Sequence, residues 1–335
     1  MIKCGVIGCG YWGPNIIRNL YEMDDIRLVS CCDIKPQRLK YIKKRYPLIE
    51  ATMDYKEMLD DPDIDAVVIA TPAFTHFQIA KEALSKDKHV LIEKPMTRTS
   101  PEAKRLIRLA RKKDRVLMVD HIFVYSPAVQ KIKEIIAKGE LGDIYYFDSV
   151  RINLGLFQHD VNVVWDLAPH DIAIMDYLLN RRPKSVSAIG SCHIGNCIEN
   201  TAYLHIKYGN NLIAHIHVNW LAPVKIRTTL IGGSRKMVVY NEIEPSEKVR
   251  VYSKGVDIRN DPDGRRKTLI DYRTGDMYAP KIEHKEALGN VCAHFIDCIA
   301  KGKEPITGGE AGLRVVEILE AAQRSIKNGG RAIQL

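Results

Sequence analysis

The first 120 residues of this chain alternate short, wholly apolar runs with amphipathic helical patterns. Runs such as VVIA at 67–70 and VLI at 90–92 have no polar face, so the strands that they predict must be covered on both sides. We expect strands near 2–7, 27–32, 65–70, 88–92 and 115–119, and helices near 13–23, 36–46, 54–60, 74–86 and 100–113. Strands joined by crossover helices predict a doubly wound parallel sheet with helices on both faces.

Beyond residue 120 the pattern changes to longer runs with a period of two. In 212–220 every second residue is apolar, from Leu212 to Trp220, and those between are mixed in character. This pattern predicts a large, mostly antiparallel open sheet in a second, α+β domain. Further helices are expected near 126–138, 166–179, 284–301 and 309–328, and 254–283 is expected to be irregular. The predicted domains are therefore 1–120 and 121–335, with the C-terminal helix able to pack back toward the first domain.

Composition argues against several classes of protein. The longest apolar runs have about six residues, far from the ~20 that a membrane helix needs. The start, MIKCGVIGCG, lacks the basic and apolar regions of a secretory signal, so a cytoplasmic protein is expected. The net charge is +9, but the densest basic stretches, 40–45 and 104–115, contain apolar residues at helical spacing. They indicate solvated helix faces, and no nucleic-acid partner is expected.

Cysteine and histidine spacing does not favour a metal site. The eight cysteines include no C-x-x-C pair, and most lie in apolar segments, which is typical of reduced, buried thiols. CHIGNC at 192–197 and the group of Cys292, His294 and Cys298 each lack four ligands at a zinc-site spacing. We therefore predict no bound metal.

Gly8, Gly10 and Gly13 form a G-x-G-x-x-G sequence that follows the first strand and opens a helix. The first glycine allows a tight turn, the second leaves room for a pyrophosphate, and the third lets the helix approach the strand. Asp33 stands twenty residues later at the end of the second strand, where a carboxylate would accept hydrogen bonds from the adenosine ribose. The pattern predicts a dinucleotide-binding first domain.

Asp33 also favours NAD over NADP, because its negative charge would repel a 2′-phosphate. Lys35 and Arg38 lie nearby and could partner such a phosphate, so NADP stays open as the less favoured cofactor. The alternative interpretation of both cations is surface charge at the start of a helix, and we prefer it.

Together with this glycine motif, ATPAFTH at 70–76, EKPMTRT at 93–99 and WDLAPHD at 165–171 make the chain resemble the Gfo/Idh/MocA family of oxidoreductases. The resemblance covers the whole chain and implies a Rossmann domain followed by a domain with a large open sheet. It implies an active-site lysine at Lys94, whose bond to the next proline is often cis in the family. It also matches Asp166 and His170 to the family's D-x-x-x-H motif.

Position and chemistry agree with these assignments. Lys94 follows the fourth strand at the carboxyl edge of the sheet, where open α/β folds bind ligands. Asp166 and His170 are four residues apart, so on a helix they share a face. Pro169 fits the first turn of a helix, which predicts a start at 166 or 167. Histidine titrates near neutrality, so we take His170 as the base and Lys94 as its partner, although the two roles could be exchanged.

The cofactor contacts are expected from the glycine motif, the second strand and the two family segments. They are Gly8, Gly10, Tyr11, Trp12, Gly13, Asp33, Thr71, Pro72, His76, Glu93, Lys94 and Pro95.

The segments 151–155 and 160–164 and the opening GYWGPNIIRN resemble the family branch that acts on UDP-linked sugars, including C3 of N-acetylglucosamine. We expect Lys94, Tyr125, Arg151, Asn162, Asp166 and His170 to contact the substrate. Arg151 suits an anionic group, because its planar guanidinium bonds a phosphate or carboxylate in two places. For Tyr125, strand-end packing is an equally good interpretation.

Two alternatives stay open: a dehydrogenase for inositol or another free sugar, and an NAD-sensing regulator without catalysis. A homodimer or homotetramer formed through the open sheet is expected.

Overall fold

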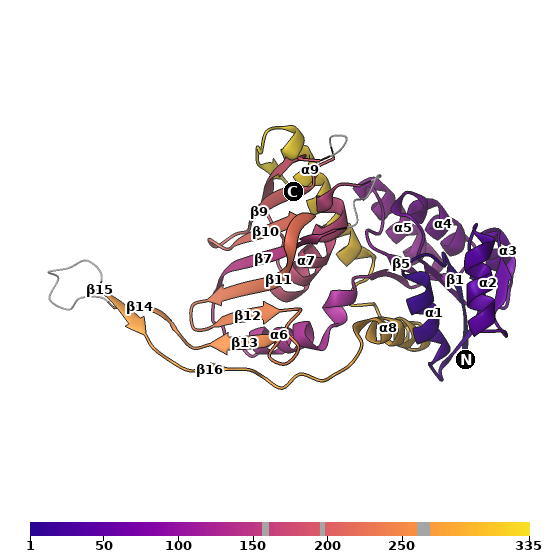
Figure 1. Cartoon of the computed structure of the whole chain (residues 1–335), viewed down its shortest axis with the longest axis horizontal. Helices are drawn as coiled ribbons and strands as arrows, with labels where there is room; N and C mark the ends of the chain where they lie inside the picture. The colour runs from indigo at the N-terminus through magenta and orange to yellow at the C-terminus, as the bar shows by residue number, and fades with distance from the viewer. Residues whose placement is uncertain (156–160, 195–197, 260–268) are drawn as a thin grey trace. The chain divides into compact units, whose positions relative to one another are not determined.

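Figure 1 shows a computed structural model of the chain, which describes residues 1–155, 161–194, 198–259 and 269–335. The chain forms two compact units. Unit 1 comprises Met1–Ser126 and Lys285–Glu320, and unit 2 comprises Pro127–His284 and Ala321–Leu335.

Unit 1 is built on a six-stranded sheet in which each neighbouring pair of strands is parallel. Its strands are β1 (Ile2–Ile7), β2 (Ile26–Cys32), β3 (Glu50–Thr52), β4 (Ala66–Ile69), β5 (His89–Glu93) and β6 (Leu117–Asp120). Its helices are α1 (Gly13–Tyr21), α2 (Pro36–Arg45), α3 (Tyr55–Asp60), α4 (Ala73–Ser85), α5 (Ser100–Lys113), the 3-10 helix η1 (Ile122–Tyr125) and α8 (Ala287–Lys301). The order β3-β2-β1-β4-β5-β6 reverses direction between β1 and β4, so the prediction of a doubly wound sheet is confirmed.

Apolar side chains explain how this sheet is covered. All four residues of β4 are buried, as expected for a strand with helices on both faces. On one face, residues of α3, α4 and α5 pack in a single core cluster with residues of β4, β5 and β6. Helix α1 contacts α8, a segment more than 260 residues further along the chain. Strand β3 was not predicted, because three residues of mixed polarity give no periodic signal.

Unit 2 contains a nine-stranded sheet of order β16-β13-β12-β11-β7-β10-β9-β8-β17. Its strands are β7 (Ile144–Leu154), β8 (Ser185–Ser191), β9 (Thr201–Lys207), β10 (Ile213–Asn219), β11 (Leu221–Gly233), β12 (Met237–Asn241), β13 (Val249–Tyr252), β16 (Met277–Tyr278) and β17 (Ile333–Gln334). Only the pair β7 and β10 is parallel among the described strands of this sheet. The large, mostly antiparallel sheet that the alternating runs predict is thus confirmed.

Helices α6 (Pro127–Ala137) and α7 (Val163–Leu179) pack together, and α7 contacts β7, β9 and β10. Ala214, Ile216 and Val218 of β10 are buried on one face of the sheet. The alternate residues His215 and His217 are partly exposed on the other face, as the alternation predicts. The helix α9 (Gly309–Lys327) begins in unit 1 and ends in unit 2.

Two further expectations concern segments away from these sheets. The segment 254–283 contains a pair of antiparallel strands, β14 (Gly255–Arg259) and β15 (Leu269–Arg273), so the prediction of an irregular excursion was wrong for these residues.

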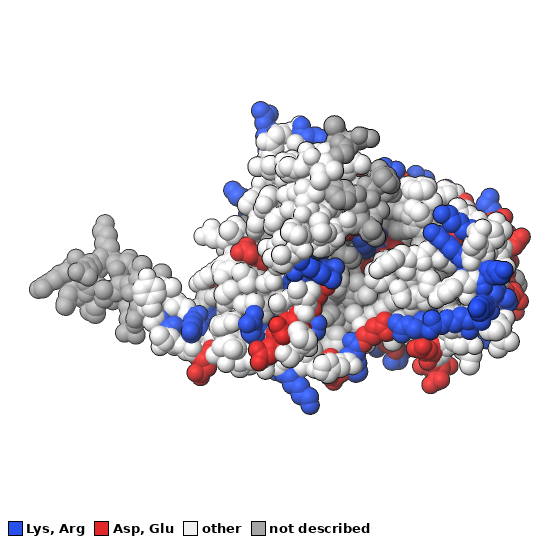
Figure 2. All heavy atoms as spheres, viewed as in Figure 1, with Lys and Arg blue, Asp and Glu red and all other residues white. Residues whose placement is uncertain are grey.

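In α2, Leu39 and Ile42 are buried and the basic residues of 40–45 are exposed. Lysine and arginine side chains gather over this region in Figure 2, which fits a solvated helix face. Among the described residues, no helix combines the length and apolar character needed to cross a bilayer.

Candidate active site

The turn between β1 and α1 needs glycine at its two ends. Gly8 has a φ of +101°, and a Cβ added there would lie 2.5 Å from the carbonyl oxygen of Ala70. A Cβ at Gly13 would lie 2.1 Å from the carbonyl oxygen of Gly8. At Gly10 the nearest atom to a Cβ would be Nη1 of Arg38, at 3.5 Å, so no backbone crowds this side of the turn. The geometry fits the tasks that the motif assigns to its three glycines.

The amino end of α1 can receive an anion. Its N-cap residue, Trp12, makes no side-chain capping hydrogen bond, and the first turn carries no acidic residue. The amides at such an end have no intrahelical acceptor and carry a partial positive charge, which favours a phosphate. Tyr11 and Trp12 are 81% and 37% exposed beside this end, with their rings 5.6 Å apart. These residues therefore fit a dinucleotide pyrophosphate.

Asp33 directly follows β2 and ties it to the glycine turn. Its carboxylate accepts the N–H groups of Cys9 and Lys35, each at 2.8 Å, and pairs with the guanidinium of Arg38 at 3.1 Å. The Asp33 side chain is only 4% exposed, whereas that of Arg38 is 42% exposed. Arg38 thus lies beside both the expected ribose ligand and Gly10. That position suits an arginine that meets either the adenosine end of a dinucleotide or its 2′-phosphate.

His76 contacts both of the family segments in unit 1, which are residues 70–76 and 93–99. Its Nε2 lies 2.8 Å from the carbonyl oxygen of Thr71, and its Nδ1 lies 2.9 Å from that of Pro95. Burial lowers the pKa of His76, although the two carbonyls act in the opposite direction. Pro72 is the N-cap residue of α4, and the bond between Lys94 and Pro95 is cis. The buried imidazole therefore holds the turn after β4 against the turn after β5.

Lys94 follows β5 at the carboxyl edge of the sheet and is partly exposed. The preceding side chain, Glu93, is buried, and one of its oxygens accepts the Lys94 N–H at 3.1 Å. Burial raises the pKa of Glu93 to about 7. Glu93, one of the predicted cofactor contacts, is therefore a buried carboxyl group with a raised pKa.

In unit 2, Asp166 and His170 lie one turn apart on α7, both partly exposed. Asp166 accepts a hydrogen bond at 3.0 Å from the indole N–H of Trp220, which follows β10. The helix begins at Val163, not at 166 or 167 as predicted from Pro169. The start is fixed by Asn162, whose side-chain oxygen caps the N–H of Trp165 at 3.1 Å, so the proline lies in the second turn.

The structure places Asn162 in a structural role. Its side-chain amide donates to Glu199 at 2.8 Å and to Gln323 at 2.6 Å, in addition to capping α7. Tyr125 is also enclosed: it is 5% exposed, and its hydroxyl lies 3.0 Å from that of Thr307. These contacts favour packing over a substrate contact for Tyr125 and do not require a ligand at Asn162.

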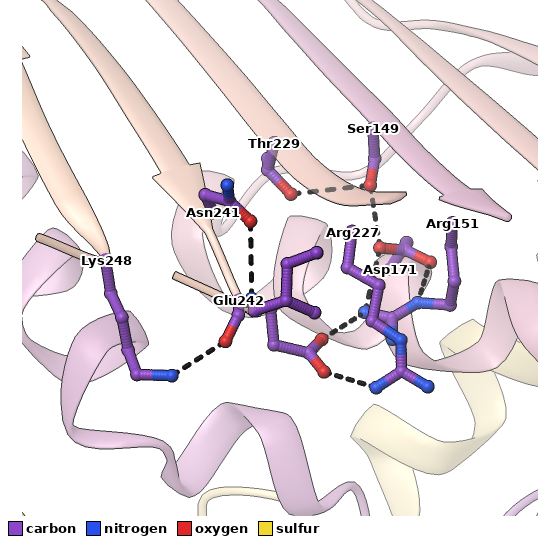
Figure 3. Close-up of polar contacts among 9 residues, drawn as sticks. Ser149, Arg151, Asp171, Arg227, Thr229, Asn241, Glu242 and Lys248 are labelled. Carbon is purple, nitrogen blue, oxygen red and sulfur yellow. Dashed lines mark hydrogen bonds and ion pairs between the residues drawn. The ribbon is translucent and has the colours of Figure 1, made fainter. Parts of the chain in front are cut away.

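Arg151 lies within a buried chain of alternating charges (Figure 3). It bonds Asp171 at 2.7 Å and Glu242 at 3.0 Å, and Glu242 also pairs with Arg227. Burial lowers the pKa of Arg151, but the two carboxylates outweigh this and raise it. Because Arg151 is 2% exposed and both carboxylates take up its charge, this placement does not favour the predicted contact with an anionic substrate. It instead anchors α7 to β7, one residue from His170.

The described residues contain no group of three or more histidine, cysteine or acidic side chains that could hold a metal. Cys197, part of one of the spacings considered above, lies outside the described residues. The seven described cysteines form no disulfide, and Cys192 is the exposed one among them.

Comparison with known proteins identifies the family. Residues 2–121 match the oxidoreductase family with an NAD-binding Rossmann fold, and residues 129–239 match the GFO/IDH/MocA C-terminal domain. The chain belongs to the Gfo/Idh/MocA oxidoreductase family. One match lies in each unit, in the order in which the glycine turn and the D-x-x-x-H segment occur.

Relatives of this Gfo/Idh/MocA chain align along nearly its whole length. An uncharacterized oxidoreductase of Bacillus subtilis, YrbE, is 25% identical and aligns with 98% of this chain and 95% of its own. The scyllo-inositol 2-dehydrogenase (NAD(+)) of the same organism is 24% identical, with the same coverage. The structure of UDP-N-acetylglucosamine 3-dehydrogenase GnnA from Acidithiobacillus ferrooxidans has a TM-score of 0.82 and 22% identity, and covers 98% of each chain.

Two features of the site were missed from the sequence. Asp120 ends β6 as Glu93 ends β5, and His121 follows it as Lys94 follows Glu93. A signal was available, since the carboxyl ends of neighbouring parallel strands meet at one edge of a sheet. The contact between Trp220 and Asp166 joins residues 54 positions apart and had no local signal.

Proposed function

We propose that this oxidoreductase transfers a hydride between a secondary alcohol of a sugar and NAD. The strongest support is the position of two sequence features on the sheet of unit 1. The glycine turn after β1 and the lysine after β5 lie at the same edge of one sheet, separated by the single strand β4. A dinucleotide with its pyrophosphate at the turn lies along this edge, which is where open α/β folds bind such ligands.

NAD, when bound, accepts the hydride, and residues of the chain must accept the hydroxyl proton. We assign His170 as the base, because imidazole titrates near neutrality without large perturbation. Lys94 is assigned as its electrostatic partner, able to donate a hydrogen bond to the developing alkoxide or to act as the base itself. Asp166 is assigned to hold the substrate hydroxyl. Its bond to Trp220 fixes one carboxylate oxygen and supports that role.

For the substrate, we propose a UDP-linked N-acetylhexosamine, or its uronic acid, oxidised at C3. The segments 151–155 and 160–164 support this choice by their resemblance to relatives that act on UDP-sugars, although residues 156–160 lie outside the described residues. The likeness of the fold to GnnA is compatible with it.

The second candidate is a dehydrogenase for inositol or another free sugar. It is favoured by the placement of Arg151, whose charge is matched by two carboxylates, so that this expected cation for a diphosphate is already engaged. The relative that acts on scyllo-inositol aligns over 98% of the chain. An NAD-sensing regulator would need neither Lys94 nor His170 for its function.

NAD is the proposed cofactor because the Asp33 carboxylate stands at the end of β2. Arg38 keeps NADP as the alternative, since it lies beside Asp33 with a side chain that is 42% exposed.

We also propose a homodimer or homotetramer through the open face of the unit 2 sheet. On that face Tyr203 stacks on His217 with ring centres 4.2 Å apart. Light scattering that detected only monomers would reject the oligomer.

Spectrophotometric assay of NAD reduction separates the candidates. UDP-N-acetylglucosamine, its uronic acid and myo-inositol are tested as substrates under identical conditions. We expect Lys94→Ala and His170→Ala each to lower turnover by at least ~10²-fold, the effect of losing a positioned proton-transfer group. Lys56→Ala and His284→Ala, at exposed positions in the same units, serve as matched controls. Near-normal turnover in both site variants would refute the mechanism, and NAD binding without turnover of any sugar would favour the regulator.

A further inference from the structure

Glu93 and Asp120 face each other at the carboxyl ends of β5 and β6. The two residues are paired in the register of these parallel strands, so their side chains leave the same face of the sheet. Glu93 is 8% exposed and Asp120 is 3% exposed, and the two side chains are within hydrogen-bonding reach of each other. Two carboxyl groups are therefore held together away from water.

Two buried carboxylates in contact cannot both be ionised without a large electrostatic cost. No donor reaches Oδ1 of Asp120 within the described parts of the chain. Burial raises the pKa of Glu93 to about 7, and burial together with the charge of Glu93 raises that of Asp120. A proton held between the two groups would supply the missing hydrogen bond and remove the repulsion. Such a pair titrates as a unit, in two separate steps.

The charged groups around the pair leave Lys94 as its counter-charge. Burial, followed by the charge of Lys94, lowers the pKa of His121 to about 3, so this neighbouring imidazole is neutral. Burial raises the pKa of two further neighbours, the Tyr125 hydroxyl on η1 and the Cys292 thiol on α8, so they also stay uncharged. Among the described residues, the positive charge of Lys94 acts on both acids, and a single negative charge on the pair matches it.

We propose that Glu93 and Asp120 share one proton at neutral pH and, as a pair with a single negative charge, position the Lys94 ammonium. Asp120 is thus a positioning residue that acts through Lys94. The shared proton is a property of unit 1 by itself, whereas the effect on turnover rests on the proposed function.

Infrared difference spectroscopy of the full chain during a pH titration tests the shared proton without substrate or cofactor. We expect the wild type to show the carbonyl stretch of a protonated carboxylic acid at neutral pH. The midpoint of its loss should move to lower pH by about one unit or more in Asp120→Asn and in Glu93→Gln, because each variant removes one of the two interacting acids. Glu50→Gln, at an exposed carboxyl of the edge strand β3, is the control and should leave the midpoint unchanged.

The absence of a protonated carboxyl in the wild type at neutral pH would overturn the proposal, even if the variants did not fold. Unchanged midpoints in both variants would also overturn it. For the positioning role, the pH profile of kcat/KM should contain a limb from the pair in addition to that of the His170 base, and Asp120→Asn should shift or remove this second limb while Glu50→Gln keeps it. If the whole profile of Asp120→Asn has the same apparent pKa values as that of the wild type, the positioning role is wrong. If the wild type oxidises no sugar but shows the infrared band, the proposed function fails and the shared proton stands.

Discussion

Replacing Asp171 by asparagine should destabilise unit 2 strongly, because it removes one charge from a buried ion pair while nearly preserving the shape of the side chain. The Asp171 carboxylate accepts from Nε of Arg151 at 2.7 Å, from its Nη2 at 3.3 Å and from the Ser149 hydroxyl at 2.7 Å. Arg151 and Asp171 are 2% and 1% exposed. Water cannot take over the lost interactions without opening the contact between α7 and β7.

The size of the effect follows from this geometry. Two unit charges about 3 Å apart attract each other by roughly 5 to 6 kcal/mol at an effective dielectric constant of about 20. Desolvation offsets much of this attraction while the pair is intact, but removing one partner leaves the other charge buried. Breaking a buried pair in this way costs about 3 to 5 kcal/mol. Glu242 still contacts Arg151 in the variant, so we expect the lower part of this range.

Urea unfolding followed by tryptophan fluorescence measures the loss, since Trp165 and Trp220 both lie in unit 2. Asp143→Asn, at an exposed position before β7, is the matched control and should change the free energy of unfolding by no more than about 0.5 kcal/mol. The double variant Arg151→Met with Asp171→Leu should recover most of the loss, because apolar replacement of a whole buried pair is often neutral. A loss below about 1 kcal/mol in Asp171→Asn, or a double variant weaker than the single one, would refute the reasoning.

Three other changes test unit 1. Asp33→Ala should weaken NAD binding and relax discrimination against NADP, and an unchanged cofactor preference in fluorescence titrations would reject its predicted contact. Gly13→Ala should lower both thermal stability and NAD affinity, because its Cβ would lie 2.1 Å from the carbonyl oxygen of Gly8; normal values of both would show that the turn can relax. Burial lowers the pKa of His89 to about 4, and its Nδ1 accepts the Val116 N–H. Between about pH 6.5 and 4, the imidazole of the unfolded chain therefore binds a proton that the folded chain does not bind. Stability should therefore fall as pH drops from about 6.5 to 4, and fall less in His89→Asn, which keeps an acceptor; equal slopes in urea unfolding would contradict this.

The features predicted well from the sequence are those with local, repeated signals. The helix α5 was expected at 100–113, and it spans Ser100–Lys113, because Pro101 lies in its first turn and apolar residues recur at helical spacing. Strand β10 likewise lies within the alternating run 212–220 and spans Ile213–Asn219. The glycine turn was predictable because its motif lies within six residues, although Gly8 is also crowded by the distant Ala70. Strand β3 was not predicted, since it is too short for a period, and the start of α7 was predicted wrongly, since it depends on a cap by Asn162.

The roles of individual polar residues were harder to predict, because they depend on partners far along the chain. Arg151 looked like an anion ligand, yet its partners lie 20 and 91 positions away, at Asp171 and Glu242. The strand pattern nevertheless contained the decisive clue. In β7, Arg151 shares a face with Phe147 and Ser149, and a face that buries Phe147 must bury the guanidinium too. A buried arginine requires a buried acid, and Asp171 lies on a helix that was expected near 166–179. Alternation within the strand, applied to the charged residue as well as to the apolar ones, therefore predicts an internal ion pair at Arg151.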